Sequence, residues 1–160
     1  MPLPGGVAVT TILAIDPGSY QSAWLRFERG KPQGFGITGN DTLTKALRTG
    51  GLPDVVVIEK IESYGMAVGA EVFDTVWWAG QFAEAVHRVP VAMLPRRAVK
   101  LALCGDSRAK DANVRQALID RFGGKDAAIG RKAAPGPLYG ISRDMWSALV
   151  IAVTYTIGGG

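Results

Sequence analysis

The apolar positions in the first third of the chain follow the patterns of extended structure. Residues 12–16 form an apolar run that ends on an acid, and residues 22–28 alternate between apolar and polar side chains. A turn containing glycine and proline separates this segment from a third extended stretch at residues 35–38. Runs and alternations bounded by turn residues predict three consecutive antiparallel strands.

The rest of the chain alternates between short apolar strands and longer helical segments. Residues 55–58 are all β-branched, which is typical of a strand buried on both faces. Another buried strand is expected at residues 91–94, and helices are expected at residues 40–48, 71–88, 97–103, 112–122 and 143–157. Asn40 or Asp41 is the expected cap of the first helix.

This order of elements predicts one α/β domain over residues 1–160, with frayed ends at residues 1–10 and 158–160. Three antiparallel strands followed by strands that alternate with helices indicate a mixed five-stranded sheet covered on both faces.

The charge is unevenly distributed in an otherwise ordinary composition. The 160 residues are 48% hydrophobic and 20% charged, with a formal net charge of +4. Residues 95–132 contain ten Lys or Arg against four Asp, a local excess of +6 that leaves about −2 for the remainder. A basic segment of this kind predicts a polyanionic partner, although solvated charge on helix surfaces explains it equally well.

Other classes of protein are disfavoured by the composition. No apolar run approaches the roughly 20 residues of a membrane span. The single cysteine excludes an internal disulfide and favours a cytoplasmic location, and with a single histidine a zinc site of the usual kind is implausible.

Three acids stand at the ends of predicted elements. Asp16 and Glu59 terminate two apolar strands, and Asp144 lies in the first turn of the last predicted helix. Each has an ordinary structural explanation: Asp16 as a turn residue, Glu59 as the partner of a lysine, and Asp144 as a favourable charge at a helix N-terminus capped by Ser142.

Taken together, the three acids predict a metal site. The carboxyl ends of strands in an open α/β sheet are where sites collect. Hard oxygen ligands suit Mg²⁺, and bound metal ions can activate water and stabilise the leaving oxygen in phosphodiester cleavage. Because carboxylates alone repel nucleic acid, such a site requires a basic surrounding, and residues 95–132 supply one.

Four segments in order resemble the RuvC-type Holliday-junction resolvases, above all those of phages and prophages. They are ILAIDPGS, VVVIEKIE, KLALCGDSRAKDANVRQAL and RDMWSALVIAVTY, and together they extend over almost the whole chain. The resemblance implies an RNase H-like fold and a homodimeric, Mg²⁺-dependent endonuclease that nicks two opposed strands of a four-way junction, with Mn²⁺ as a possible substitute.

The resemblance assigns metal binding to Asp16, Glu59 and Asp144. Family members commonly have a further Asp three residues after the last of these, where this chain has Ser147. Positions i and i+3 share a helix face, so Ser147 is expected to point at the site. The chain is therefore expected to be either a nuclease with a weaker metal position or a protein that binds junctions without cutting them.

The resemblance also implies basic contacts to DNA. Lys100 and Lys110 stand where the family has lysines important for junction binding or cleavage, and Lys110 is also expected to take part in the reaction, because it precedes a helix N-terminus that favours phosphate. Further expected contacts are Arg96, Arg97, Arg108 and Arg115, and Lys125, Arg131 and Lys132 in the aperiodic segment 123–140, which we expect to be mobile without DNA.

Two other features bear on junction binding. Tyr64, in the loop after Glu59, is expected either to stack on bases at the junction centre or to be an ordinary loop residue.

The helix at residues 71–88 has two apolar strips, of which one (Phe73, Val76, Trp77, Gly80, Ala83) is expected to pack on the sheet. The other (Val72, Ala79, Phe82, Val86), with Trp78 at the margin of the contact, is expected either to form a dimer interface or to be buried inside the monomer. A nuclease of the same fold acting on branched DNA or RNA–DNA hybrids remains the alternative enzyme.

Overall fold

The computed structural model describes residues 10–158 and contains one mixed five-stranded sheet. Its strands are β1 (Ile12–Asp16), β2 (Gln21–Glu28), β3 (Lys31–Gly39), β4 (Val55–Lys60) and β5 (Val91–Pro95), in the spatial order β3-β2-β1-β4-β5. Strands β1, β2 and β3 are antiparallel, whereas β4 runs parallel to both β1 and β5. The predicted α/β class and mixed sheet are confirmed. Of the ends expected to fray, residues 1–9 and 159–160 lie outside the described residues.

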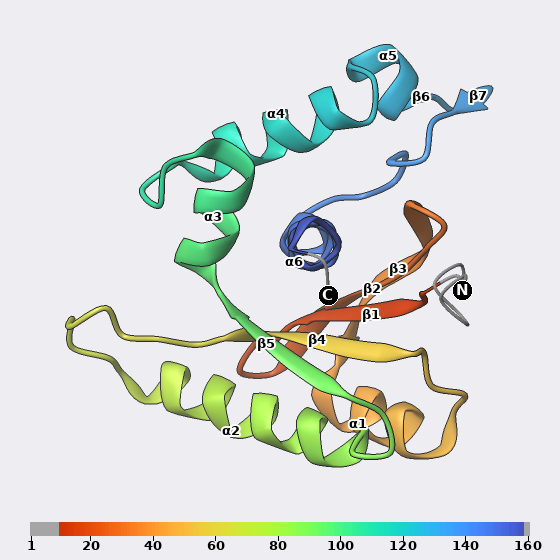
Figure 1. Ribbon diagram of the computed structural model, residues 1–160. Coiled ribbons are helices and arrows are strands. Elements are labelled where there is room, and N and C mark those ends of the chain that lie inside the picture. The colour runs from red at the N-terminus through yellow and green to blue at the C-terminus, as the bar shows by residue number, and fades with distance from the viewer. Residues whose placement is uncertain (1–9, 159–160) are drawn as a thin grey trace, which may run out of the picture.

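Helices cover both faces of this sheet (Figure 1). Helices α1 (Asn40–Thr49) and α2 (Ala70–Ala85) lie on one face, and α6 (Met145–Ile157) crosses the other face. Helices α3 (Arg96–Cys104) and α4 (Asp111–Arg121) stand beside α6 on that second face. None of the described helices is long and apolar enough to cross a membrane.

Strand β4 belongs to two hydrophobic clusters because its side chains alternate between the two faces. Val57 packs with Leu149 and other residues of α6, while Val56 and Ile58 pack with Phe82 of α2. All five side chains are fully buried. A strand with a helix on each side needs no polar face, which is why residues 55–58 are uniformly β-branched.

The expected assignment of the two strips of α2 is wrong. Ala79, Phe82 and Ala85 are the buried side chains of the helix, and they face the sheet. Phe73 and Trp77, which were expected to pack on the sheet, are 65% and 57% exposed. The two alanines let the helix approach closely enough to seat the Phe82 ring. Trp78 is partly buried against the same cluster and stacks on Phe82, with ring centroids 6.1 Å apart.

The segment at residues 123–140 contains more structure than its sequence pattern indicates. It forms the short helix α5 (Lys125–Ala128) and a hairpin of β6 (Gly130–Arg131) and β7 (Ala134–Pro135). Ala128 and Leu138 are buried in the cluster beneath α6. The sequence does not predict α5, β6 and β7, because elements this short do not show a helical or strand periodicity.

Candidate active site

Asp16 is held at the end of β1 by a tight turn with a buried polar network. The backbone N–H of Gly18 donates to Ser22 Oγ (3.1 Å), and Ser22 Oγ donates in turn to Asn40 Oδ1 (2.6 Å). The amide of Asn40 donates back to the Gly18 carbonyl (2.9 Å). A side chain at Gly18 would collide with the carbonyl oxygen of Gln21. The expected capping role of Asn40 is wrong, because its side chain locks this turn and makes no cap hydrogen bond.

Glu59 lies beside Asp16 because β1 and β4 run parallel in register. Ile15 pairs with Ile58, so the next residue of each strand emerges at the same edge of the sheet. Asp16 is 8% exposed and Glu59 is 7% exposed. Burial, followed by the charge of Glu59 and a hydrogen bond between the two carboxyls, raises the pKa of Asp16 to about 8. Two buried carboxyls in this arrangement cannot both ionise cheaply without a cation.

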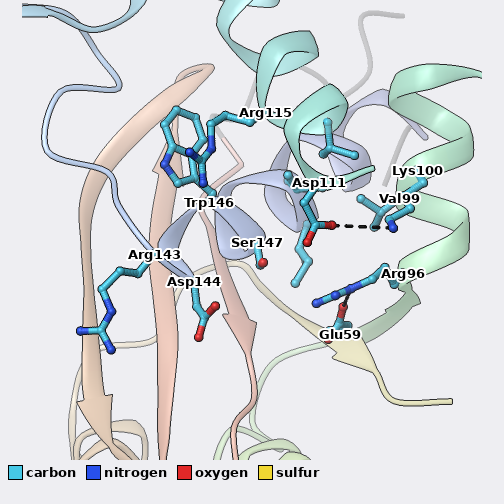
Figure 2. Close-up of a pocket in the computed structure, with 13 residues that line it drawn as sticks. Glu59, Arg96, Val99, Lys100, Asp111, Arg115, Arg143, Asp144, Trp146 and Ser147 are labelled. Atoms are coloured by element: carbon cyan, nitrogen blue, oxygen red, sulfur yellow. Dashed lines mark hydrogen bonds and ion pairs between the residues drawn. The ribbon is translucent and has the colours of Figure 1, made fainter. Parts of the chain in front are cut away.

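Asp144 approaches these two acids from the start of helix α6. Together with Glu59 it lines a cavity beside the sheet. Its charge contributes to raising the pKa of Asp16, against the lowering effect of Arg96. Helix α6 begins at Met145, so Asp144 occupies the N-cap position. The expectation that Ser142 caps this helix is therefore wrong. Arg143 has a φ of 52°, a left-handed conformation that turns the chain into the helix. Figure 2 shows Asp144 and Ser147 facing the cavity and Arg143 pointing away.

Asp16 and Glu59 are the two carboxyl groups that lie together at this edge of the sheet as candidate metal ligands. Between residues 10 and 158, no three His, Cys, Asp or Glu side chains are close enough together to hold a metal ion. The three carboxylates of the expected metal site are therefore not gathered closely enough to form such a group, although the charge of Asp144 acts on Asp16. The Asp16–Glu59 pair nevertheless offers hard oxygen ligands whose mutual repulsion a cation relieves.

A cavity of about 240 Å³ adjoins these acids. Its charged and polar lining residues are Glu59, Arg96, Lys100, Asp111, Arg115, Arg143, Asp144 and Ser147, and its apolar lining includes Trp146 (Figure 2). Arg96 Nε lies 3.0 Å from Glu59 Oε1, and Lys100 Nζ lies 3.7 Å from Asp111 Oδ1. The guanidinium of Arg115 lies 5.1 Å from the Trp146 ring centroid. Three of the expected basic residues thus border the cavity.

The other expected basic residues do not line this cavity. Lys110 is exposed as the N-cap residue of α4, and the remaining ones, Arg108, Lys125, Arg131 and Lys132, are also exposed. Arg97 instead pairs with Glu62 at 3.6 Å and lies 5.9 Å from the ring centroid of Tyr64. Tyr64 is half exposed and lines a second cavity on the other side of Glu59 and Arg96.

Sequence analysis missed Asp111, Trp146 and the contact between Arg96 and Glu59. Asp111 directly precedes the helix expected at residues 112–122 and directly follows Lys110, one of the expected basic residues. The ion pair between Arg96 and Glu59 depends on how β5 aligns with β4, where Glu59 pairs with Leu94 two residues before Arg96. No local pattern encodes that register.

Two solved structures share the fold of this chain. A structure of RuvC from Thermus thermophilus matches with a TM-score of 0.68 at 17% identity, over 93% of this chain and 95% of that chain. A structure described as T. thermophilus RuvC in complex with Holliday junction substrate matches with a TM-score of 0.68 at 19% identity, over 94% of each chain. No family model and no curated protein matches the sequence. The likeness shows that this chain shares the fold of these RuvC structures.

Proposed function

We propose that the chain is a metal-dependent endonuclease that cuts four-way DNA junctions by paired nicks on opposed strands. The observation that carries the proposal is the buried pair of acids, Asp16 and Glu59, at the edge of the sheet beside a cavity with a basic rim. One RuvC structure of the same fold is described as a complex with Holliday junction substrate, which supports the junction as the DNA bound.

The position of each residue in the site determines the role that we assign to it. Asp16 and Glu59 sit on rigid strand ends and would hold the cation, and Asp144 would join them as the third ligand from the start of α6. The cation, Mg²⁺ or Mn²⁺, supplies activation of water and charge stabilisation when bound. Lys100 and Arg115 on the rim neutralise the DNA backbone near the cut. Because Lys110 lies outside the cavity, we assign it a phosphate contact along the DNA instead of a part in the reaction.

Helix α2 supports a two-fold dimer, although through the face opposite to the one expected. Phe73 and Trp77, together with Val76, which is 47% exposed, form an apolar strip on its outer side. Exposed apolar side chains that gather on one face of a helix are typical of protein interfaces. A dimer through this strip presents two active sites, which matches the approximate two-fold symmetry of a four-way junction.

The test is cleavage of a mobile four-way junction with Mg²⁺, Mn²⁺ or EDTA, compared with three-way DNA, duplex DNA and an RNA–DNA hybrid. The variants are Asp16→Asn and Glu59→Gln, and the control is Glu84→Gln, an acid on the solvent side of α2 whose side chain is 74% exposed. We expect paired, metal-dependent nicks from the native protein and from the control, and none from the two site variants.

The other outcomes separate the alternatives. Preferential cutting of three-way DNA or of the hybrid would replace the junction with that substrate. Tight junction binding without cleavage under any metal would leave a binding protein, the outcome favoured by the neutral Ser147 and by the unassembled third ligand.

A further inference from the structure

Arg96 reaches the acidic centre of the site from a fixed position. It is the first residue of α3 and follows directly on β5, whose neighbour is β4. Its Nε lies 3.0 Å from Glu59 Oε1, and it borders the cavities on both sides of that carboxylate. Figure 2 shows the guanidinium over Glu59 with its far end toward the cavity. Arg96 therefore belongs to the centre of the site, unlike the arginines on the rim.

The surroundings of Arg96 keep it charged. Burial alone acts to lower the pKa of the guanidinium, but the carboxylate of Glu59, with Asp16 and Asp111 farther away, raises it above its ordinary value. An arginine is in any case protonated at every pH at which the protein is folded. The site thus contains one permanent positive charge before any metal ion binds.

Among the cations that border the cavity, Arg96 is the one paired with Glu59, whereas Lys100 pairs with Asp111, Arg115 lies over the Trp146 ring and Arg143 points away. Asp16, Glu59 and Asp144 contribute three negative charges when ionised, and the contact of Arg96 offsets one of them. The acids and Arg96 together then carry a charge of −2, which one Mg²⁺ neutralises. One turn along α6 from Asp144, the residue facing the cavity is Ser147, which adds no charge. The other nearby acid, Asp111, is already paired with Lys100.

We propose that the Arg96 guanidinium is the second cation of this site, so that the chain binds one divalent ion and contacts the scissile phosphate through Arg96. This inference rests on the proposed nuclease function. A two-ion site uses its second ion to stabilise charge on the reacting phosphate. A planar guanidinium matches phosphate geometry and performs the same electrostatic role without needing ligands of its own. The contact of Nε with Glu59 fixes the direction in which the terminal nitrogens point.

The experiment combines metal titration with cleavage. Calorimetric titration with Mn²⁺ gives the number of ions per chain and their affinity for the native protein, Arg96→Gln and Arg96→Lys. The control is Arg48→Gln, which removes an exposed arginine from α1 on the opposite face of the sheet. Single-turnover cleavage of the four-way junction is then measured at saturating metal. Circular dichroism melts verify that each variant is folded.

We expect one Mn²⁺ per chain in the native protein. Removing the competing positive charge in Arg96→Gln should raise Mn²⁺ affinity at least about fivefold. The same change should slow cleavage by about 10²-fold or more, as the loss of one preorganised charge donor does elsewhere. Arg96→Lys should retain native Mn²⁺ affinity and recover part of the rate, and Arg48→Gln should behave as the native protein.

Three results would overturn the proposal: two Mn²⁺ ions per native chain, unchanged Mn²⁺ affinity in Arg96→Gln, or cleavage by Arg96→Gln as fast as or faster than native. The last would make Arg96 an inhibitory latch on Glu59 or a structural residue. If the native protein cuts no substrate with any metal, the proposed nuclease function fails, and with it the phosphate contact. The Mn²⁺ count and the affinity change still decide whether Arg96 takes the place of a second ion.

Discussion

Replacing Asp16 with asparagine should stabilise the metal-free protein at neutral pH. The pKa of Asp16 is raised from 3.8 to about 8, first by burial and then by Glu59, so the folded state resists ionisation that the unfolded state undergoes freely. Below pH 3.8 the carboxyl is protonated in both states and costs nothing. As the pH rises from 3.8 toward 8, the unfolded state releases the proton and the folded state does not, so stability is lost throughout that window.

The size of this loss in folding stability follows from how far the pH lies above the ordinary pKa of Asp16. Between pH 3.8 and pH 7 there are about three pH units, and at about 1.4 kcal/mol per unit the penalty is on the order of 4 kcal/mol at pH 7. At pH 4.5 the same reasoning leaves about 1 kcal/mol. The asparagine amide that replaces the carboxyl does not ionise and can donate a hydrogen bond to Glu59, so the variant should escape most of this penalty.

The assay is urea unfolding in EDTA at several pH values from about 4.5 to about 8.5, which cover most of the window between the ordinary and the raised pKa of Asp16. The free energy of unfolding of Asp16→Asn should exceed that of the native protein by a margin that grows with pH, while Glu84→Gln, at an exposed acid, should stay within about 0.5 kcal/mol. A variant less stable than native at pH 7, or a margin that does not shrink toward pH 4.5, would refute the inference that this acid is held in the fold at a cost in stability.

Four further predictions concern the fold, the dimer, the turn beside Asp16 and the DNA surface. Phe82→Ala should reduce the free energy of unfolding by about 3–5 kcal/mol because the ring is fully buried, whereas Trp77→Lys should leave a folded monomer in analytical ultracentrifugation if α2 forms the dimer. Gly18→Ala should destabilise the turn that positions Asp16, by about 1–3 kcal/mol in urea unfolding, and should weaken Mn²⁺ binding in calorimetry. Arg115→Gln should weaken junction binding equally for different sequences and reduce the slope of log affinity against log salt by about 1, measured by fluorescence anisotropy. An unchanged slope would remove Arg115 from the DNA surface.

The sequence predicted the parts of the site that depend on local pattern. Apolar runs that end on Asp16 and Glu59 indicated two buried strands, and parallel pairing then placed both acids at one edge of the sheet. The faces of α2 were not predictable in the same way, because both strips are apolar and hydropathy does not distinguish them. The structure buries Ala79, Phe82 and Ala85 against the sheet and leaves Phe73 and Trp77 exposed.

The role of polar residues in the site was harder to predict because it depends on contacts distant in sequence. Asn40 has the residue type of a helix cap, yet it is buried and bonded to Ser22 and Gly18, 18 and 22 positions away. Arg96 and Glu59 are 37 positions apart and meet only through the alignment of β5 with β4. A charge pattern identifies such residues as basic or polar but does not identify their partners.

The repulsion between the buried acids accounts both for the instability of the site and for the chemistry that we propose for it. Asp16 and Glu59 are buried on rigid strands, so neither can swing into solvent to escape the other, and their repulsion persists until a proton or a cation relieves it. Arg96 relieves part of it at Glu59, where its Nε contacts the carboxylate. A divalent ion that relieves the rest stabilises the folded state by the free energy of its binding. If the chain binds metal and DNA as proposed, DNA phosphate brought to the same cavity adds negative charge beside the bound cations, so metal and DNA must each raise the affinity of the site for the other by the same factor. Under that proposal, the acids that weaken the metal-free fold are the groups that make metal binding favourable.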